Sequence, residues 1–242
     1  ALQLKTLRFK QCTETTMVNF LIDNSGSMQF GSKMVELKNA MVVFGSNFPD
    51  SGILGIQVYS DPQTYPPLGY KELITISEYR NIKDQYVASI NTMRSAGGTH
   101  SKDAMSFAKT KLEEAKVLFP NKQPHLIIIS DGMPETRETE LALCPGGVPN
   151  SPLCSISSSP GGSPDCRCFA EIQDPTSVAS QIKSAGVRIF TISYVDTADS
   201  KFNNNLQTLM QNVASSPSDY FQAPVESQVT NILKQISERL CN

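Results

Sequence analysis

Three short segments of this chain carry oxygen-bearing side chains in patterns that suit a single metal ion. They are Asp23-Asn24-Ser25-Gly26-Ser27, Gly97-Gly98-Thr99 and Ser130-Asp131-Gly132. Carboxylate and hydroxyl oxygens, with no Cys or His required, are donors that suit Mg²⁺ or Mn²⁺ rather than Zn²⁺. Such a set looks built to hold an ion with one coordination position open, not to turn over a substrate. The candidate ligands are Asp23, Ser25, Ser27, Thr99 and Asp131.

Alternating strand and helix patterns predict the elements that position these segments. Continuous apolar runs predict buried strands, and apolar residues at helical spacing predict the helices between them. The order is typical of one α/β domain, doubly wound, with a mostly parallel central sheet and helices on both faces. The expected strands are residues 15–22, 52–59, 73–76, 125–129, 187–195 and 220–222, and the expected helices are 33–48, 78–93, 101–118, 175–185, 202–214 and 225–240.

The three segments are expected to meet at one edge of this sheet. Asp23 and Asp131 each follow a strongly apolar strand. In an open parallel sheet, ligands bind beyond the carboxyl ends of the strands. Thr99 lies in a Gly-Gly loop before a helix that Ser101 can cap. The side chains should therefore converge on one point beyond that edge.

The pattern Asp23-x-Ser25-x-Ser27, followed by Thr99 and by Asp131-Gly132, resembles the metal-ion-dependent adhesion site of von Willebrand factor A domains. The order of strands and helices resembles that family as well, from about residue 15 to about residue 240. The resemblance implies that the serine hydroxyls and, in a high-affinity state, the threonine hydroxyl contact Mg²⁺ or Mn²⁺. It also implies that the aspartates act directly or through water. An ion that few carboxylates neutralise can then accept an acidic side chain from a partner protein.

The six cysteines predict disulfides and an oxidising compartment, because their number is even and four lie in one Pro/Gly/Ser-rich stretch. A zinc site made by those four is the alternative, although their spacing lacks the paired C-x2-C knuckles of such sites. We expect Cys166 and Cys168 to pair with Cys144 and Cys154, in either order. The family resemblance, in which the chain ends meet opposite the metal, implies a further disulfide between Cys12 and Cys241.

Two regions depart from the regular pattern. Residues 132–171 are expected to form a disulfide-rich insert that walls the metal face and shapes specificity, and the alternative is a decoration remote from the ligand. Residues 1–14 are expected to be the stump of a stalk or anchor, with an ordinary edge element as the alternative. The von Willebrand factor A domain would then span residues 15–242.

Composition and motifs exclude several classes of function. The net charge of -2, without a basic stripe, gives no support for nucleic-acid binding. No run of 18 apolar residues exists, so the given sequence predicts no membrane span. We expect His100 to be a solvent-exposed loop residue and His125 to be a structural residue at the start of a buried strand. Nucleophile-elbow, Walker and dinucleotide motifs are absent from the sequence.

These observations predict an extracellular, Mg²⁺-dependent adhesion module without enzymatic activity. It would belong to a larger cell-surface or pilus assembly and capture an Asp or Glu carboxylate of an extracellular-matrix or host-surface protein. One alternative is an intracellular module of the same fold that acts with an AAA+ ATPase or a chelatase, against which the cysteines argue. Another is a hydrolase that uses the metal as a Lewis acid. It would need a base such as His100 or an acidic residue of the insert.

Overall fold

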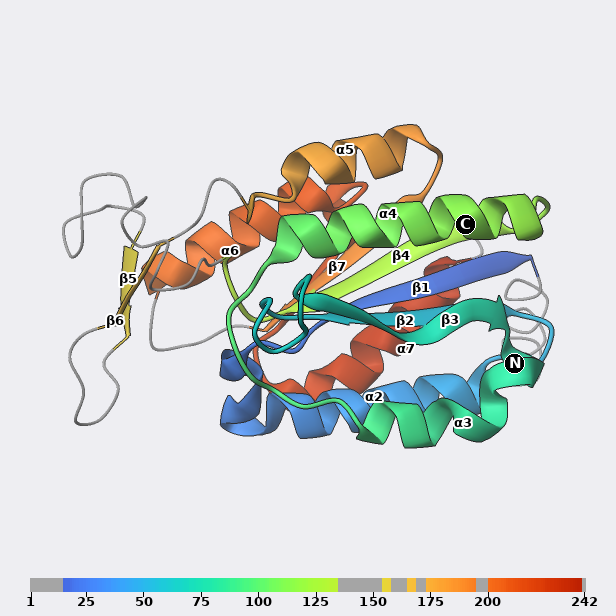
Figure 1. Ribbon diagram of the computed structural model, residues 1–242, viewed down its shortest axis with the longest axis horizontal. Helices are drawn as coiled ribbons and strands as arrows, with labels where there is room; N and C mark the ends of the chain where they lie inside the picture. The colour runs from blue at the N-terminus through green and yellow to red at the C-terminus, as the bar shows by residue number, and fades with distance from the viewer. Residues whose placement is uncertain (1–14, 135–153, 158–164, 169–172, 195–199, 241–242) are drawn as a thin grey trace.

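The computed structural model describes residues 15–134, 154–157, 165–168, 173–194 and 200–240 (Figure 1). Its central sheet has six strands in the order β3-β2-β1-β4-β7-β8. All neighbouring strands are parallel except β2 and β3. The predicted fold class, a doubly wound and mostly parallel sheet, is therefore confirmed. The strands are β1 (Thr16–Asp23), β2 (Ile53–Tyr59), β3 (Tyr70–Glu78), β4 (Gln123–Ser130), β7 (Arg188–Tyr194) and β8 (Tyr220–Ala223).

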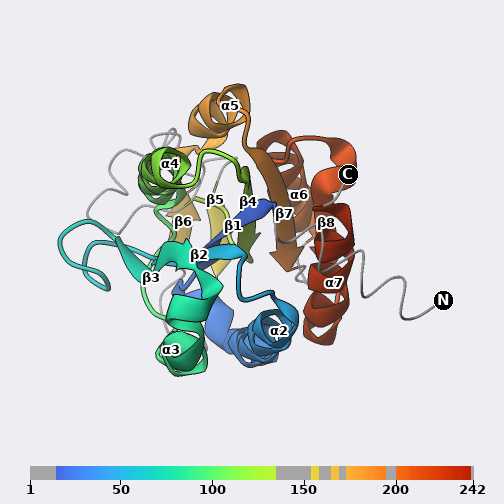
Figure 2. The ribbon, with the colours of Figure 1, turned by 90° about the vertical axis from the view of Figure 1, so that its right-hand side faces the viewer.

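Helices cover both faces of the sheet (Figures 1 and 2). Every residue of β1 is buried, because alternate side chains enter the two helical layers. Phe20, for example, packs into the cluster of one layer and Leu21 into that of the other. Among the described residues, no helix is both long and apolar enough to cross a membrane. One layer holds α2 (Lys33–Asn47), α3 (Tyr79–Asn91) and α7 (Val229–Arg239), and the other holds α4 (Ser101–Leu118), α5 (Thr176–Ser184) and α6 (Ser200–Val213).

Three elements differ from their predicted form. The third strand was expected over 73–76 but spans nine residues and runs antiparallel to β2. The prediction was too short because only Ile74 and Ile76 of this strand are buried, so the apolar pattern marks only its middle. The expected cap at Ser101 is wrong: α4 begins at Ser101 itself, whose hydroxyl donates to the carbonyl of Gln173 at 3.1 Å. The last helix is preceded by a short 3-10 turn, η5 (Glu226–Gln228), and begins only at Val229.

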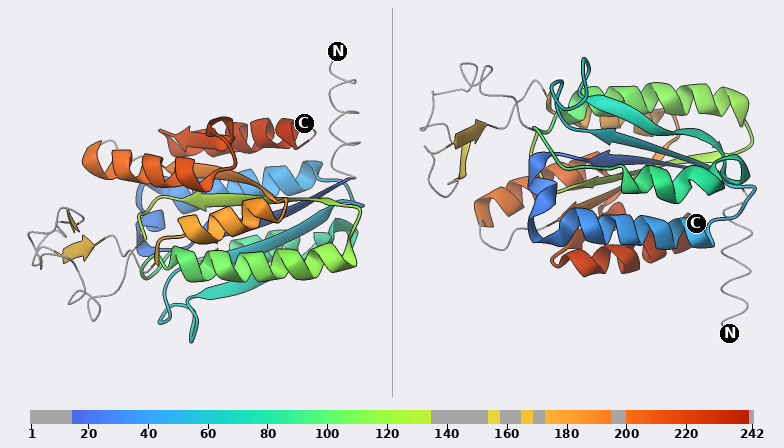
Figure 3. Two further views of the ribbon diagram at one scale, coloured as in Figure 1. Left: turned by 90° about the horizontal axis from the view of Figure 1, so that it is seen from above. Right: turned by 60° about the horizontal axis from the view of Figure 1, so that its bottom comes forward.

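A small hairpin lies apart from the main sheet. Its strands, β5 (Cys154–Ser157) and β6 (Asp165–Cys168), are antiparallel and lie beyond the carboxyl ends of β1 and β4 (Figures 1 and 3). The backbone register places Cys154 opposite Cys168. The predicted Cys12–Cys241 bridge and the partners of Cys144 fall outside the described residues. The disulfide framework therefore stays a prediction.

Candidate metal centre

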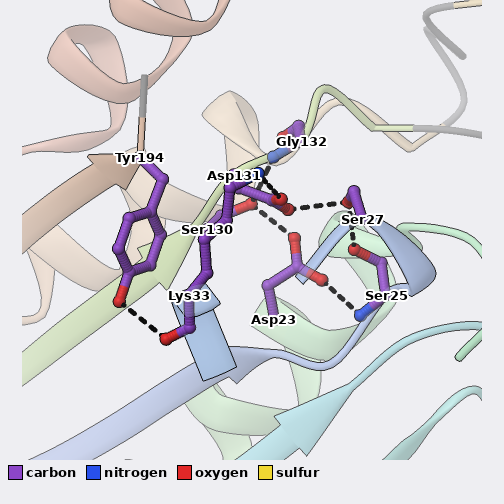
Figure 4. A network of polar contacts seen from close by, with 8 residues as sticks. All are labelled: Asp23, Ser25, Ser27, Lys33, Ser130, Asp131, Gly132 and Tyr194. Atoms are coloured by element: carbon purple, nitrogen blue, oxygen red, sulfur yellow. Dashed lines mark hydrogen bonds and ion pairs between the residues drawn. The ribbon is translucent and has the colours of Figure 1, made fainter. Parts of the chain in front are cut away.

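Neighbouring parallel strands bring the two predicted aspartates together. Asp23 is the last residue of β1, and Asp131 directly follows β4. The register pairs Ile22 with Ile129, so both strands end at the same level of the sheet. After β1 the chain turns into a 3-10 segment, η1 (Gly26–Ser32), which carries Ser27 over the edge. Figure 4 shows the resulting network of polar contacts.

The Asp23 carboxylate is fully buried and uses both of its oxygens. Oδ1 accepts a hydrogen bond from the backbone N–H of Ser25 at 2.7 Å. Oδ2 accepts one from the hydroxyl of Ser130 at 2.5 Å. These contacts fix the carboxylate at the strand end, where its orientation no longer depends on solvent.

The Asp131 carboxylate lies at the centre of a short chain of contacts. Its Oδ1 accepts a hydrogen bond from the Ser27 hydroxyl at 2.7 Å, and its Oδ2 lies 2.6 Å from the ammonium of Lys33. The hydroxyls of Ser25 and Ser27 lie 3.0 Å apart. Ser27 therefore contacts the predicted aspartate directly, although it lies 104 residues earlier in the chain, and Ser25 contacts Ser27.

Thr99 differs from the other four site residues, because its hydroxyl is buried but takes no part in the hydrogen-bond network. Its side chain is 1 % exposed, and its Oγ1 has no hydrogen-bond partner among the described residues. A Cβ placed on Gly132 would lie 3.2 Å from this hydroxyl and 3.8 Å from Asp23 Oδ2. The Thr99 hydroxyl and the Asp23 carboxylate therefore border the same small space beside Gly132. An unpaired buried hydroxyl costs free energy, which a ligand in that space would recover.

The loop that carries Thr99 is held by backbone contacts to the first segment. The N–H of Gly26 donates to the carbonyl of Gly97 at 2.9 Å. Gly97 has a φ of 77°, which favours glycine, and a Cβ there would lie within 2.6 Å of three side-chain oxygens. Behind the loop, the carboxylate of Asp61 accepts from the N–H of Gly98 at 2.7 Å. Asp61 is thus a positioning residue that the motif did not reveal.

The two carboxylates of the site lie close enough together to disfavour the ionised form of Asp23. Burial, and after it the nearby charge of Asp131, together raise the pKa of Asp23 to about 7. Hydrogen bonds from Ser130 and Ser25 oppose this shift. A cation beside both carboxylates would remove the repulsion and favour the ionised form. The donor set fits a hard divalent ion, since it offers two carboxylates and three hydroxyls without nitrogen or sulfur.

The structure brings all five predicted site residues to one edge of the sheet, but the prediction for the neighbouring His100 is wrong. His100 was expected to be exposed to solvent and is only 5 % exposed. Its backbone N–H donates to the carbonyl of Ser60 at 2.9 Å, which draws the start of α4 against the end of β2. His125, expected to be structural, is 2 % exposed, and its Nδ1 lies 3.0 Å from the carbonyl of Gln123.

Sequence reasoning missed two further residues of the network. Ser130 holds Asp23, and it lies within the third oxygen-rich segment, so its position gave a usable signal. Lys33 forms an ion pair with Asp131, and the only sequence signal was a basic residue at the expected start of a helix. That position is unfavourable for a cation, because it adds positive charge to the positive end of the helix dipole.

Comparison with known proteins places the fold in a family. Residues 18–133 match the family model of the von Willebrand factor type A domain. No curated protein matches the sequence of this chain. The similar solved structures include the pilus adhesin SpaC from Lactobacillus rhamnosus GG, with a TM-score of 0.70 and 15% identity over 94% of this chain and 31% of that one.

Two more structures extend the comparison. The vWF domain of the type V pili tip protein Mfa5 from Porphyromonas gingivalis has a TM-score of 0.64 and 14% identity, over 93% of this chain and 95% of that one. Proximal thread matrix protein 1 from the mussel byssus, with a zinc-occupied MIDAS motif, has a TM-score of 0.61 and 15% identity, over 94% of this chain and 48% of that one. At these identities the likeness establishes the fold alone. The chain spans about a third of the SpaC structure and about half of the mussel protein.

Proposed function

We propose, from the premise that this chain carries a von Willebrand factor type A domain, that it is an extracellular adhesion module rather than an enzyme. Asp23, Ser25, Ser27, Thr99 and Asp131 would hold a divalent cation, Mg²⁺ or Mn²⁺. The bound ion would capture an Asp or Glu carboxylate of a protein partner. The domain would span residues 15–242, with residues 132–171 as an insert on the metal face and residues 1–14 as a stalk.

The buried Thr99 hydroxyl is the single observation that carries this proposal. It has no hydrogen-bond partner among the described residues, and it borders the same space as Asp23 Oδ2. A purely structural threonine at this depth would be expected to bond to a neighbour. The Ser25–Ser27–Asp131 chain of contacts presents further oxygens at the same edge.

When bound, a divalent ion would supply a positive charge that its own protein ligands neutralise only in part. The chain's residues would do the rest. Asp23 and Asp131 are oriented by hydrogen bonds from Ser25, Ser130 and Ser27, so both carboxylates already lie at the edge where the ion would bind. The hydroxyl donors add no charge, which leaves the ion attractive to a partner's carboxylate.

The relatives support a surface location and a larger assembly. SpaC is described as a pilus adhesin and Mfa5 as a pili tip protein. A chain in such a setting would keep its six cysteines oxidised. A count of free thiols in the native protein should therefore find none. Six free thiols would favour the intracellular alternative of the same fold.

A binding panel tests the adhesive function. Immobilised collagen, fibronectin and fibrinogen would be offered to the protein in Mg²⁺, in EDTA, and in EDTA followed by excess Mg²⁺. At least one surface should retain the protein in Mg²⁺ and lose it in EDTA, and retention should return when Mg²⁺ is restored. Retention that EDTA leaves unchanged would overturn the metal-dependent mechanism.

A further inference from the structure

Lys33 occupies a position that helix formation does not favour. It is the first residue of α2, where a cation meets the positive end of the helix dipole. The two residues before it adopt left-handed backbone conformations, with φ of 63° at Gly31 and 65° at Ser32. Such a conformation is uncommon for serine and costs conformational energy. Two features at the start of α2 are therefore unfavourable in free energy: the cation at the helix N-terminus and the left-handed backbone of Ser32.

The surrounding structure holds Lys33 against Asp131. The Tyr194 hydroxyl, at the end of β7, donates to the backbone carbonyl of Lys33 at 3.3 Å and ties the first turn of α2 to the sheet (Figure 4). The Lys33 ammonium then lies 2.6 Å from Asp131 Oδ2. The side chain of Lys33 is 14 % exposed and that of Asp131 is 0 % exposed. This ion pair is shielded from water, so its strength exceeds that of a surface pair.

The ammonium and a divalent ion would need the same carboxylate. Asp131 has one oxygen on the Ser27 hydroxyl and the other on Lys33, so it has no free oxygen that faces away from both. An arriving metal would have to displace the ammonium or share the carboxylate with it at close range. With Lys33 retained, two carboxylates, one ammonium and one divalent ion leave the site with one net positive charge.

We propose that Lys33 is a built-in cation that competes with the divalent metal for Asp131. It stabilises the metal-free site, weakens metal binding and leaves the loaded site more positive toward an anionic partner. The inference rests on the proposed metal site and adds a determinant outside the five metal-binding positions. A lysine suits this role because its ammonium is a compact charge without the fixed fork of an arginine.

Isothermal titration with MgCl₂ tests this competition in the wild-type protein, in K33M and in K38M. Lys38 lies on the same helix and contacts the carbonyl of Asn91, so K38M removes the same charge without touching Asp131. K33M should bind Mg²⁺ about tenfold more tightly than the wild-type protein, because a nearby positive charge has gone. K38M should stay within about twofold of it.

Thermal unfolding gives a second readout. Without metal, K33M leaves a buried carboxylate unpaired and should unfold at a lower temperature than the wild-type protein. Saturating Mg²⁺ should then raise its Tm by more than it raises the wild-type Tm. If K33M does not fold without metal, K33Q, which keeps a polar end that can donate to Asp131, replaces it in both measurements.

The outcomes separate the two proposals. Equal Mg²⁺ affinity in K33M and the wild-type protein, or weaker affinity in K33M, would overturn the role of Lys33 and leave the metal site standing. Mg²⁺ binding by K33M alone would support the competition in its strongest form. No binding by either protein would overturn the proposed metal site itself.

Discussion

Two buried aspartates at opposite edges of the sheet are paired with cations in different ways. At the carboxyl edge, Asp131 meets the single ammonium of Lys33 and the hydroxyl of Ser27. At the amino edge, Asp219 ends a short 3-10 turn, η4 (Pro217–Asp219), and meets the guanidinium of Arg188, which opens β7. Both carboxylates are buried, yet within the described part of the chain only the Asp131 region contains a neighbouring side chain whose hydrogen-bonding atom lacks a partner.

The Asp219 region is closed. Arg188 donates to it through Nη2 at 2.8 Å and through Nε at 3.2 Å, and Ser216 donates at 2.9 Å. The guanidinium also lies over the ring of Phe190, 4.8 Å from its centroid. A guanidinium that donates twice to the carboxylate and stacks on an aromatic ring is held in a fixed geometry and pairs the charge of Asp219. The Asp131 region instead combines a point charge with the unpaired hydroxyl of Thr99. The comparison teaches that a buried carboxylate is not by itself a candidate binding site, and that the unpaired hydroxyl beside Asp131 is what distinguishes the two regions.

The largest expected effect comes from breaking the ion pair of Arg188 and Asp219. R188M keeps an apolar stem over Phe190 but leaves Asp219 buried without its guanidinium, so the free energy of unfolding should fall by roughly 3 kcal/mol. Urea unfolding followed by circular dichroism measures this loss. Mg²⁺ affinity should not change, since the two regions lie at opposite edges of the sheet. A loss of less than about 1 kcal/mol would contradict the closed-pair interpretation.

Removal of the Asp131 carboxylate should strongly weaken metal binding, with a smaller cost in stability than R188M. D131A should weaken Mg²⁺ binding by about 100-fold or more, because loss even of an outer partner of a metal site costs up to that much. Isothermal titration measures the affinity, and near-ultraviolet circular dichroism checks that the fold persists. Mg²⁺ binding by D131A at wild-type affinity would exclude Asp131 from the site.

Removal of one hydroxyl should have opposite effects in the two regions. T99V deletes a buried hydroxyl that has no partner among the described residues, so the metal-free protein should gain about 1 kcal/mol of stability while Mg²⁺ binding weakens about tenfold. S216A deletes a hydroxyl that donates to Asp219, so it should cost about 1 kcal/mol and leave Mg²⁺ binding unchanged. The same urea and titration experiments measure both variants. Equal signs for the two stability changes would contradict the contrast between open and closed regions.

The smallest expected effect is a pH dependence of metal binding. Asp23 has its pKa raised to about 7 in the metal-free protein, and a metal favours its ionised form. A proton therefore competes with Mg²⁺ below pH 7, and affinity should fall about threefold from pH 7.5 to pH 6.5. Above pH 8 the affinity should level off. Titrations at these pH values in one ionic strength measure the effect, and an affinity that rises as pH falls would contradict it.

The same shift predicts how the metal-free fold responds to pH. Because the folded protein holds the Asp23 proton up to about pH 7 and the unfolded chain releases it near pH 3.8, this group lowers stability as pH rises between those values. His125 acts in the other direction. Burial lowers its pKa to about 4, so its contribution is lost as pH falls from 6.5 toward 4.

Much of the fold, and the position of the candidate site residues at one end of the sheet, could be predicted because they depend on patterns that are local in the sequence. The apolar runs of β1 and β4 fixed where Asp23 and Asp131 would lie, since carboxyl ends of parallel strands share one edge. The two glycines directly before Thr99 indicated a tight loop at the same edge. These features depend on period and spacing, which a single sequence displays.

The remaining features depend on tertiary contacts that a single sequence does not display. Lys33 reads as an ordinary surface lysine until α2 is placed beside the end of β4. His100 is buried because its backbone bonds to Ser60, which belongs to a separate loop. Only part of the antiparallel edge strand β3 could be predicted, because an edge strand buries few of its side chains and so has a weak apolar pattern. The hairpin of β5 and β6 had no periodic signal at all.

The central position of β1 has a consequence for how this protein is made. Ser130 follows its partner Asp23 by 107 residues, and Asp131 follows Ser27 by 104. The oxygen-bearing side chains of the candidate site cannot come together until the ribosome has released β4, which completes the middle of the sheet. Under the proposed function, a nascent chain would gain affinity for Mg²⁺ only once β4 has paired with β1, and that affinity would report that the centre of the domain has formed.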